Sequence, residues 1–432
     1  MKRLLSAVSF ALALSSTAFA AAPATVDDAL ALAKKTHTPV LLDFGAPWCY
    51  SCYFMATHVL NGAEWKALEK RTVVGEIDAD SPDGAAWMKK LQIKALPAYV
   101  VLNENGDELG RVLGEQTRAK FYPEIDKILS GSHTLDQLKK TAYEGSMDAI
   151  AAVLASYEAR KEGAEGLDWY ARVPPAVRGK SAQNATVLLW VDRLMLTRAM
   201  KTKDTMHAVG AAKRALAGDI GCDRPYVVDE LLEATDKMPP AQRKTMLTPE
   251  KAALDRMLAE DIFIAKPKCA DQRSAVITTA DVDAALGDTK AETAVLDHAI
   301  EAVRKQLGGN YKKDRNAADN LRVYLVRAKR TDELDALYPK LIAAYPDDYV
   351  YPYRWGKSLL ERGKPAEALP LLEKAAGKAY GENRLAVATQ RVKALKALHR
   401  QADAEKVVAE VLEQNGQSFP EQVDQLKAAL KS

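Results

Sequence analysis

Two cysteines, Cys49 and Cys52, stand three positions apart in the segment APWCYSC, residues 46–52. Thiols at this spacing can form and reopen a disulfide, and the thiolate form of either is a nucleophile towards another disulfide. The same spacing occurs in half of a zinc site and in static disulfides. The chain has no second Cys-x-x-Cys pair and no suitably spaced histidines to complete a zinc site. The sequence therefore favours a redox-active dithiol, with a static disulfide as the alternative.

The residues before the pair predict how it is held. The apolar run VLLDF, residues 40–44, is typical of a buried strand. A turn and then a helix that starts near Cys49 would place this thiol at a helix N-terminus, where unpaired N–H groups and the helix dipole lower the pKa of a thiol. Cys52 would lie one turn along the same helix, close enough to resolve a mixed disulfide. Trp48 would shield the pair and offer an apolar contact surface to a substrate chain.

Further strands and helices are expected in the first 131 residues. The hydrophobic patterns predict strands at residues 72–78, 98–102 and 108–113, with a hairpin turn at Asn105-Gly106, and helices at 25–35, 49–70, 82–90 and 117–129. We interpret the small residues Ser130-Gly131-Ser132 as a linker. Residues 21–131 thus have the size of one domain.

This region resembles the thioredoxin superfamily, on the strand-turn-CxxC motif at residues 40–52 and on LPA at residues 96–98. Within the superfamily it is most similar to secreted and periplasmic reductants, including the soluble C-terminal domain of the membrane electron conductor for disulfide reduction. The resemblance implies an α/β domain, a central mixed β-sheet flanked by helices. No cofactor is expected.

The resemblance also implies a role for each matching residue. Cys49 would attack and Cys52 would resolve. Asp43 would be the buried acid that takes a proton from the second cysteine; an exposed carboxylate at the strand end is the alternative. Pro97 would follow a cis peptide bond that faces the dithiol and leaves the backbone of Leu96 free to pair with a substrate strand.

From residue 132 to 432 the chain shows no strand pattern, and alanine, leucine, lysine and glutamate dominate. The segments 321–344, 353–377 and 385–412 share a rhythm that resembles the paired helices of tetratricopeptide repeats, whose period is 34 residues. Residues 184–216 look like a more divergent pair. We therefore expect an all-α, tetratricopeptide-like repeat domain, with an irregular helical bundle as the alternative. Its lysines and arginines read as a solvated helix face.

Cys222 and Cys269 have no reactive motif around them. In an oxidising compartment they are expected to form a structural disulfide, which stabilises by roughly 4 kcal/mol on the chain-entropy model. A thiol relay to Cys49 is the alternative. His58 lies six residues after Cys52 and could tune it, although a packing or surface role is the simpler interpretation.

The N-terminus predicts export. Lys2 and Arg3, an apolar stretch at residues 4–14 and the small-x-small triplet at 18–20 form a signal peptide, residues 1–20, with cleavage after Ala20. No later segment has the roughly 18 apolar residues of a membrane span. The formal net charge of +3 becomes nearly neutral without Lys2 and Arg3, so no nucleic-acid partner is expected. The predicted location is periplasmic or secreted.

Together these features predict an exported thiol–disulfide oxidoreductase that reduces or isomerises disulfides in exported proteins, with a helical domain that binds partners. A reductant would need a membrane-embedded electron donor, because the compartment itself is oxidising. Between the cysteines stand Tyr50 and Ser51 and no histidine, which argues against a strong oxidase. The direction of electron flow stays open. The alternative is an assembly factor whose helical repeats do the main work, with an accessory redox domain.

Overall fold

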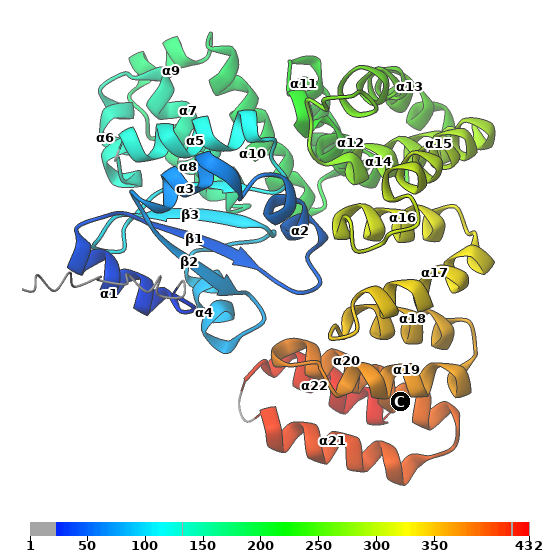
Figure 1. Cartoon of the computed structure of the whole chain (residues 1–432). Coiled ribbons are helices and arrows are strands. Elements are labelled where there is room, and N and C mark those ends of the chain that lie inside the picture. The colour runs from blue at the N-terminus through cyan, green and yellow to red at the C-terminus, as the bar shows by residue number, and fades with distance from the viewer. Residues whose placement is uncertain (1–22, 132, 416–417, 432) are drawn as a thin grey trace, which may run out of the picture.

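The computed structural model describes residues 23–131, 133–415 and 418–431 (Figure 1). The expected signal peptide at residues 1–20 lies outside the described residues. An α/β region comes first and a row of helices follows, which confirms the predicted fold class. The elements of the first region are α1 (Val26–Thr36), β1 (Val40–Gly45), α2 (Tyr50–His58), α3 (Gly62–Glu69), β2 (Val73–Asp78), α4 (Pro82–Lys90), β3 (Ala98–Leu102), β4 (Glu108–Leu113) and α5 (Arg118–Gly131).

The four strands form one mixed sheet in the order β2-β1-β3-β4. Strand β1 pairs in parallel with β2 and antiparallel with β3, and β3 pairs antiparallel with β4. Because side chains alternate between the two faces of a strand, Leu42 and Phe44 pack on one core with residues of α1, and Leu41 packs on the other with Met55 of α2 and Phe121 of α5. Asp43 shares the face of Leu41, so it points towards the side of the sheet that α2 covers.

The predicted single helix at residues 49–70 is two helices. Helix α2 ends at His58 and α3 begins at Gly62, whose φ of 76° suits glycine. The amide of Asn61 donates back to the carbonyl of Thr57 at 2.7 Å, which satisfies one of the last carbonyls of α2. The predicted linker at residues 130–132 also differs, since α5 continues to Gly131.

Residues beyond 132 form helices and no strand in the ranges that the structure describes. The longer ones are α6 (Leu135–Tyr143), α7 (Met147–Ala159), α8 (Gly163–Ala171), α9 (Pro175–Ser181), α10 (Ala185–Thr202), α11 (Thr205–Ala217), α12 (Arg224–Thr235), α13 (Pro240–Met257), α14 (Gln272–Ala285), α15 (Thr289–Leu307), α16 (Arg315–Arg327), α17 (Thr331–Ala344), α18 (Val350–Glu361), α19 (Pro365–Ala376), α20 (Gly381–Ala397), α21 (Gln401–Asn415) and α22 (Pro420–Lys431). Two short turns of helix, η1 (Gly221–Asp223) and η2 (Leu258–Ile262), interrupt the row.

Consecutive helices pack on one another along this row, as the repeat pattern predicts. Helices α16, α18 and α20 begin at residues 315, 350 and 381, each followed by a partner helix. Gly356 lets α18 lie close to α19, because a Cβ atom there would be 2.8 Å from Leu372. The predicted divergent pair at 184–216 corresponds to α10 and α11.

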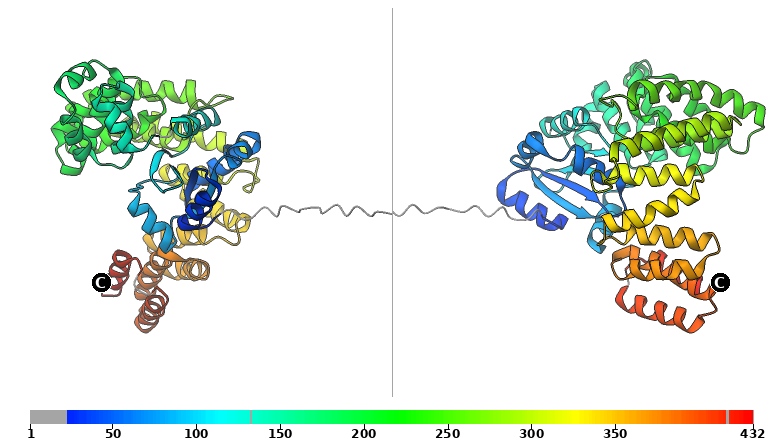
Figure 2. Two further views of the ribbon diagram at one scale, coloured as in Figure 1. Left: turned by 90° about the vertical axis from the view of Figure 1, so that its left-hand side faces the viewer. Right: turned by 45° about the vertical axis from the view of Figure 1, so that its right-hand side comes forward.

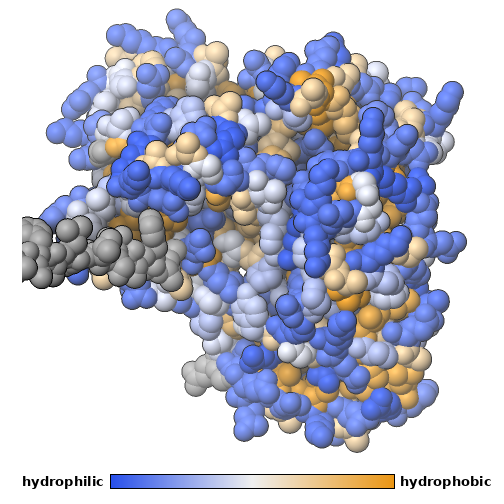
Figure 3. All heavy atoms as spheres, in the orientation of Figure 1, coloured by the Kyte–Doolittle hydropathy of each residue, from blue (hydrophilic) through white to orange (hydrophobic). Residues whose placement is uncertain are grey.

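The row of helices curves around the α/β region (Figures 1 and 2). Helix α6 packs on β4 at one end, and α16 packs on α2 further along. The face seen in Figure 3 is mostly hydrophilic, with apolar side chains in separate patches. Among the described residues, none of the helices has the length and apolar character that crossing a membrane requires. Because α2 begins directly after Cys49, its contact with α16 turns the end of the sheet that carries the two cysteines towards the chain's own helices.

Candidate active site

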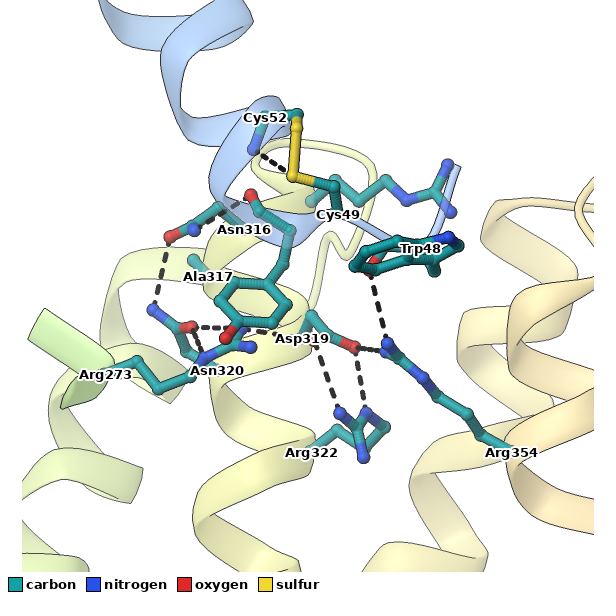
Figure 4. A network of polar contacts seen from close by, with 12 residues as sticks. Trp48, Cys49, Cys52, Arg273, Asn316, Ala317, Asp319, Asn320, Arg322 and Arg354 are labelled. Atoms are coloured by element: carbon teal, nitrogen blue, oxygen red, sulfur yellow. Dashed lines mark hydrogen bonds and ion pairs between the residues drawn. A yellow bond between two sulfur atoms is a disulfide. The ribbon is translucent and has the colours of Figure 1, made fainter. Parts of the chain in front are cut away.

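Cys49 is the N-cap residue of α2, and its sulfur accepts a hydrogen bond from the backbone N–H of Cys52 at 3.1 Å (Figure 4). The two cysteines are joined by a disulfide. Cys49 is only 3% exposed, whereas Cys52 is half-buried. The N–H groups of the first helical turn and the helix dipole favour a thiolate at Cys49 once the disulfide is reduced. The expected position of the pair at a helix start is confirmed.

Asp43 provides a carboxyl on the face of the sheet beneath α2. Its neighbours across the sheet are Glu76 in β2 and Tyr99 in β3. Burial, and then the nearby carboxylate of Glu76, raise the pKa of Asp43 from 3.8 to about 7. A carboxyl with this pKa can take or give a proton near neutral pH.

The Leu96–Pro97 peptide bond is cis. It comes directly before β3, and the first residue of that strand, Ala98, pairs with Phe44 near the end of β1. The cis bond therefore lies at the same end of the sheet as the dithiol. Pro97 is buried and its carbonyl accepts from the N–H of Gly114 at 2.9 Å, while Leu96 is half-buried.

Trp48 keeps 39% of its surface exposed. Its indole N–H donates to a carboxylate oxygen of Asp80 at 3.0 Å, which fixes the ring beside the pair. Burial raises the pKa of Asp80 to about 6, although the hydrogen bond from Trp48 favours its ionised form. The apolar ring of Trp48 thus lies next to Cys49, and Asp80, in the loop after β2, fixes its orientation.

Residues of the helical region bind the backbone of the motif itself. Three side chains donate hydrogen bonds to three carbonyl groups around Cys49. They are Arg315 to Pro47 at 3.4 Å, Arg354 to Trp48 at 3.3 Å and Asn316 to Tyr50 at 3.1 Å. None of these three residues was predicted from the sequence. The carbonyl of Pro47 also accepts from the hydroxyl of Tyr53 at 2.8 Å, so the helical contacts add to one that the α/β region makes itself.

Arg273 of α14 lies over the ring of Tyr50, with its guanidinium carbon 2.9 Å from the ring centroid. Behind it, Asp319 of α16 accepts from three arginines (Figure 4), namely Arg273 at 3.1 Å, Arg322 at 2.9 Å and Arg354 at 2.7 Å. Burial alone would raise the pKa of Asp319, but these three cations hold it well below its usual range. The expectation of a solvated arginine face is wrong here, because these arginines turn inward to a buried carboxylate.

Glu115 is another buried carboxyl beside the motif, two residues after the end of β4. The amide of Asn316 donates to it at 3.0 Å, and it also hydrogen-bonds with Ser51, which stands between the cysteines. Burial raises the pKa of Glu115 to about 8, and the nearby carboxylate of Asp271 adds to this effect. Its carboxyl therefore holds its proton to a higher pH than an exposed glutamate does.

A signal for these residues was present in the sequence. Asn316, Asp319 and Asn320 follow one another at the i, i+3 and i+4 spacing of a single helix face. A buried helix face usually consists of apolar side chains that pack in the core. Here it is polar, and the exposed fractions of Asn316, Asp319 and Asn320 are 5%, 2% and 4%. A buried polar stripe predicts a polar partner, although it does not identify which one.

Three other residues that the sequence singled out are His58, Cys222 and Cys269. His58 is within 2.9 Å of Asp314, the N-cap residue of α16, so its contact in the structure is to the helical region. Cys222 and Cys269 form a disulfide between η1 and the loop before α14. Lys120 of α5 reaches to 2.8 Å from the sulfur of Cys222. In the part of the chain that the structure describes, no group of three or more His, Cys, Asp or Glu is arranged to hold a metal ion.

Comparisons with known proteins agree with this geometry. Residues 26–129 match the family model of the thioredoxin-like domain. The thiol:disulfide interchange protein DsbD of Klebsiella pneumoniae is 34% identical over 102 residues, which are 23% of this chain and 17% of that protein. The chloroplastic thioredoxin Y of Oryza sativa is 32% identical over 98 residues, 23% of this chain and 55% of that protein. The chain thus spans under a fifth of the interchange protein.

Solved structures give matches to both regions. A thioredoxin from Thermus thermophilus is 29% identical and covers 25% of this chain and 85% of its own, with a TM-score of 0.24. A tetratricopeptide repeat protein from Parabacteroides merdae is 14% identical and covers 67% of this chain and 99% of its own, with a TM-score of 0.38. On the family model and the geometry around Cys49 and Cys52, residues 26–129 are a thioredoxin-like domain.

Proposed function

We propose that the chain is a thiol–disulfide oxidoreductase that works through Cys49 and Cys52. The observation that carries the proposal is a disulfide at the N-terminus of α2, on the face of the sheet that also presents Asp43 with a pKa of about 7. The cis bond before Pro97 at the same end of the sheet adds to it. These are the groups that nucleophilic attack, proton transfer and substrate pairing require.

In the reducing direction the reaction has two steps. The thiolate of Cys49 attacks a substrate disulfide, so that a mixed disulfide forms and one substrate sulfur leaves as a thiolate. Asp43 takes the proton of Cys52, and the Cys52 thiolate attacks the sulfur of Cys49. The second substrate sulfur leaves, the Cys49–Cys52 disulfide forms, and two electrons have passed to the substrate. An external dithiol must then reduce the pair again.

The N-terminal segment and the likeness to interchange proteins support a place outside the cytoplasm. We therefore propose that the substrates are exported proteins or peptides with disulfides, and that a membrane-embedded donor supplies the electrons. In this setting the domain would reduce or isomerise disulfides. The division at residue 131 between a redox domain and a helical domain belongs to the same proposal.

The test is disulfide reduction by the full chain with a chemical reductant as electron source. Replacing the attacking thiol, Cys49→Ser, should abolish turnover, whereas the control Cys222→Ser breaks the other disulfide and should keep it. Unchanged turnover in Cys49→Ser would exclude the dithiol as the reacting group. The reduction potential of the pair then gives the direction of electron flow, since a strongly reducing value supports a reductase.

A second candidate is an assembly or binding factor with an accessory redox domain. The low exposure of Cys49 and the hydrogen bonds from the helical region to the carbonyls beside it favour this candidate, because exchange with a large partner is then restricted. A double replacement, Cys49→Ser with Cys52→Ser, separates the two functions. If the biological role survives this change in full, the helices do the main work.

A further inference from the structure

The helical region covers the side of the dithiol motif on which a docking partner would lie. Cys49 is 3% exposed, although it is the sulfur that must meet a substrate. The carbonyls of residues 47, 48 and 50, which flank it, all accept hydrogen bonds from α16 and α18. The carbonyl of Pro47 also accepts from the hydroxyl of Tyr53 at 2.8 Å, whereas without the helical region the carbonyl of Trp48 would face water or a bound chain. Here the protein's own helices occupy that place (Figure 4).

The contact is tightly packed. Beside Trp48 and Tyr53 the two regions leave a cavity of about 10 Å³, room for about one water molecule. The guanidinium carbon of Arg315 lies 4.0 Å from the ring centroid of Tyr53. Further along, the start of α20 lies so close to the loop after β2 that a Cβ atom on Gly381 would be 1.9 Å from the carbonyl oxygen of Asp80.

One side of the site stays open. Trp48 is 39% exposed, and Ala95, just before the cis-proline turn, is exposed as well. Leu96 and Cys52 are half-buried. Access therefore runs past the edge of the indole ring and along the cis-proline turn, while the side towards α16 and α18 is closed.

From this arrangement we infer that the helical region selects substrates by width. Disulfides whose flanking groups are narrow, either small molecules or unfolded peptide segments, reach Cys49 from the open side. A disulfide on the surface of a folded protein would have to displace α16 and α18. The inference rests on the proposed thiol–disulfide exchange and adds the substrate class.

The covering helices resist displacement for an electrostatic reason. Asp319 is buried and shared by three arginines, of which Arg273 lies on Tyr50 and Arg354 binds the carbonyl of Trp48. Pulling the motif away would leave these groups to find new partners. The ion pairs of Asp319 all lie within the helical region, so separation would cost the contact of Arg273 with the Tyr50 ring and the hydrogen bond of Arg354 to Trp48. A folded substrate would have to supply equivalent contacts before it could react.

The first experiment measures access to Cys49 directly. The variant Cys52→Ser leaves Cys49 as a single free thiol, because the other two cysteines are bonded to each other. The reduced thiol is labelled with iodoacetamide and, separately, with a maleimide that carries a polyethylene glycol chain. Each labelling rate is divided by the rate of the same reagent with the unfolded protein. We expect this normalised rate to be at least about tenfold higher for iodoacetamide than for the bulky maleimide.

A wedge at the interface then tests the cause. Gly381→Ala places a Cβ against Asp80 and forces α20 away from the α/β region. Gly308→Ala is the matched control, since it has a similar backbone angle, φ 57° against 53°, and nothing within 4 Å of the new atom. Both variants place an alanine at a positive φ and so carry similar backbone strain. Only Gly381→Ala, which also pushes against Asp80, should raise the rate of labelling by the bulky reagent, by about tenfold.

Turnover by the protein with both thiols gives the second readout. Oxidised glutathione and an unstructured disulfide peptide are the two narrow substrates, and a folded protein with a surface disulfide is the wide one. We expect the folded protein to react slowest and to gain most from Gly381→Ala. If only oxidised glutathione or only the disulfide peptide reacts, the result identifies the substrate class as small molecules or as peptide segments. Both of these results support selection by width.

Equal rates for narrow and wide substrates in the wild-type protein would overturn the inference, even if the wedge variant failed to fold. Equal behaviour of Gly381→Ala and Gly308→Ala would overturn it too. Neither outcome affects the proposed exchange activity. That proposal fails on its own test, if the wild-type protein turns over none of the three substrates or if Cys49→Ser remains active.

Discussion

Replacing Asp43 by asparagine should make the protein gain stability over the wild type as the pH rises. The amide keeps the shape of the carboxyl but cannot ionise. In the folded protein the pKa of Asp43 is raised from 3.8 to about 7, first by burial and then by Glu76. The folded state therefore holds a proton that the unfolded state has already lost, and wild-type stability falls as the pH rises from about 3.8 to about 7.

The size of the effect follows from the shift. About three pKa units correspond to roughly 4 kcal/mol of folding free energy lost once the pH exceeds the folded pKa. Between pH 5 and pH 8 the wild type should lose roughly 2.5 kcal/mol relative to Asp43→Asn. An unsatisfied amide in the variant could add a constant cost. The trend with pH is therefore the quantity to compare, rather than the value at one pH.

The assay is urea unfolding of the oxidised full chain at several pH values between 5 and 8. Asp27→Asn, at an exposed position in the first turn of α1, is the matched control for the same change of side chain. A difference between Asp43→Asn and wild type that stays constant with pH would refute the assignment of a neutral, buried carboxyl at this position.

The same replacement should slow catalysis. Without a proton acceptor, Cys52 resolves the mixed disulfide only through its own small thiolate fraction, so turnover should fall and its dependence on pH near 7 should disappear. Single-turnover release of the second substrate thiol measures this step. If Asp43→Asn reacts with the wild-type pH profile, another group moves the proton.

Three further outcomes are expected. Asp319→Asn leaves three arginines around a neutral amide and should destabilise the fold by about 3–5 kcal/mol, measured by urea unfolding. Cys222→Ser should cost roughly 4 kcal/mol or less in the same assay. Glu115→Gln keeps the shape of the hydrogen-bonded side chain. Because burial raises the pKa of Glu115 from 4.5 to about 8, the wild type should lose stability relative to this variant as the pH rises through that range. A difference in unfolding free energy between the two proteins that stays constant from pH 5 to 9 would contradict the raised pKa.

The dithiol site was predictable because its parts obey local rules. When a helix starts directly after a turn, its first residue lies at the helix N-terminus, and this does not depend on the rest of the chain. The alternation of β1 likewise puts Asp43 on a fixed face of the sheet. The break between α2 and α3 was missed because it depends on the backbone of one glycine, Gly62, and on a side-chain cap by Asn61.

The cover over the site was not predictable in the same way. Arg273, Asn316 and Arg354 lie more than 200 residues from the motif in sequence, on three different helices. Their positions depend on how each helix pair stacks on the last, and small rotations per pair add up along a solenoid. A charged residue on a helix looks the same in sequence whether it faces water or a partner, so these arginines were interpreted as solvated.

The helical region was expected to recruit a partner, and its contacts with the motif bear on how it could do so. Side-chain donors on α16 and α18 bind the carbonyls of Pro47 and Trp48, in the loop before α2, and of Tyr50, the first residue of α2, and aromatic rings line the same contact. These are the means by which a groove holds an extended peptide. A foreign peptide on this face would have to replace residues 47–50. Binding there and access to Cys49 are then linked, because whatever displaces the loop also uncovers the thiol.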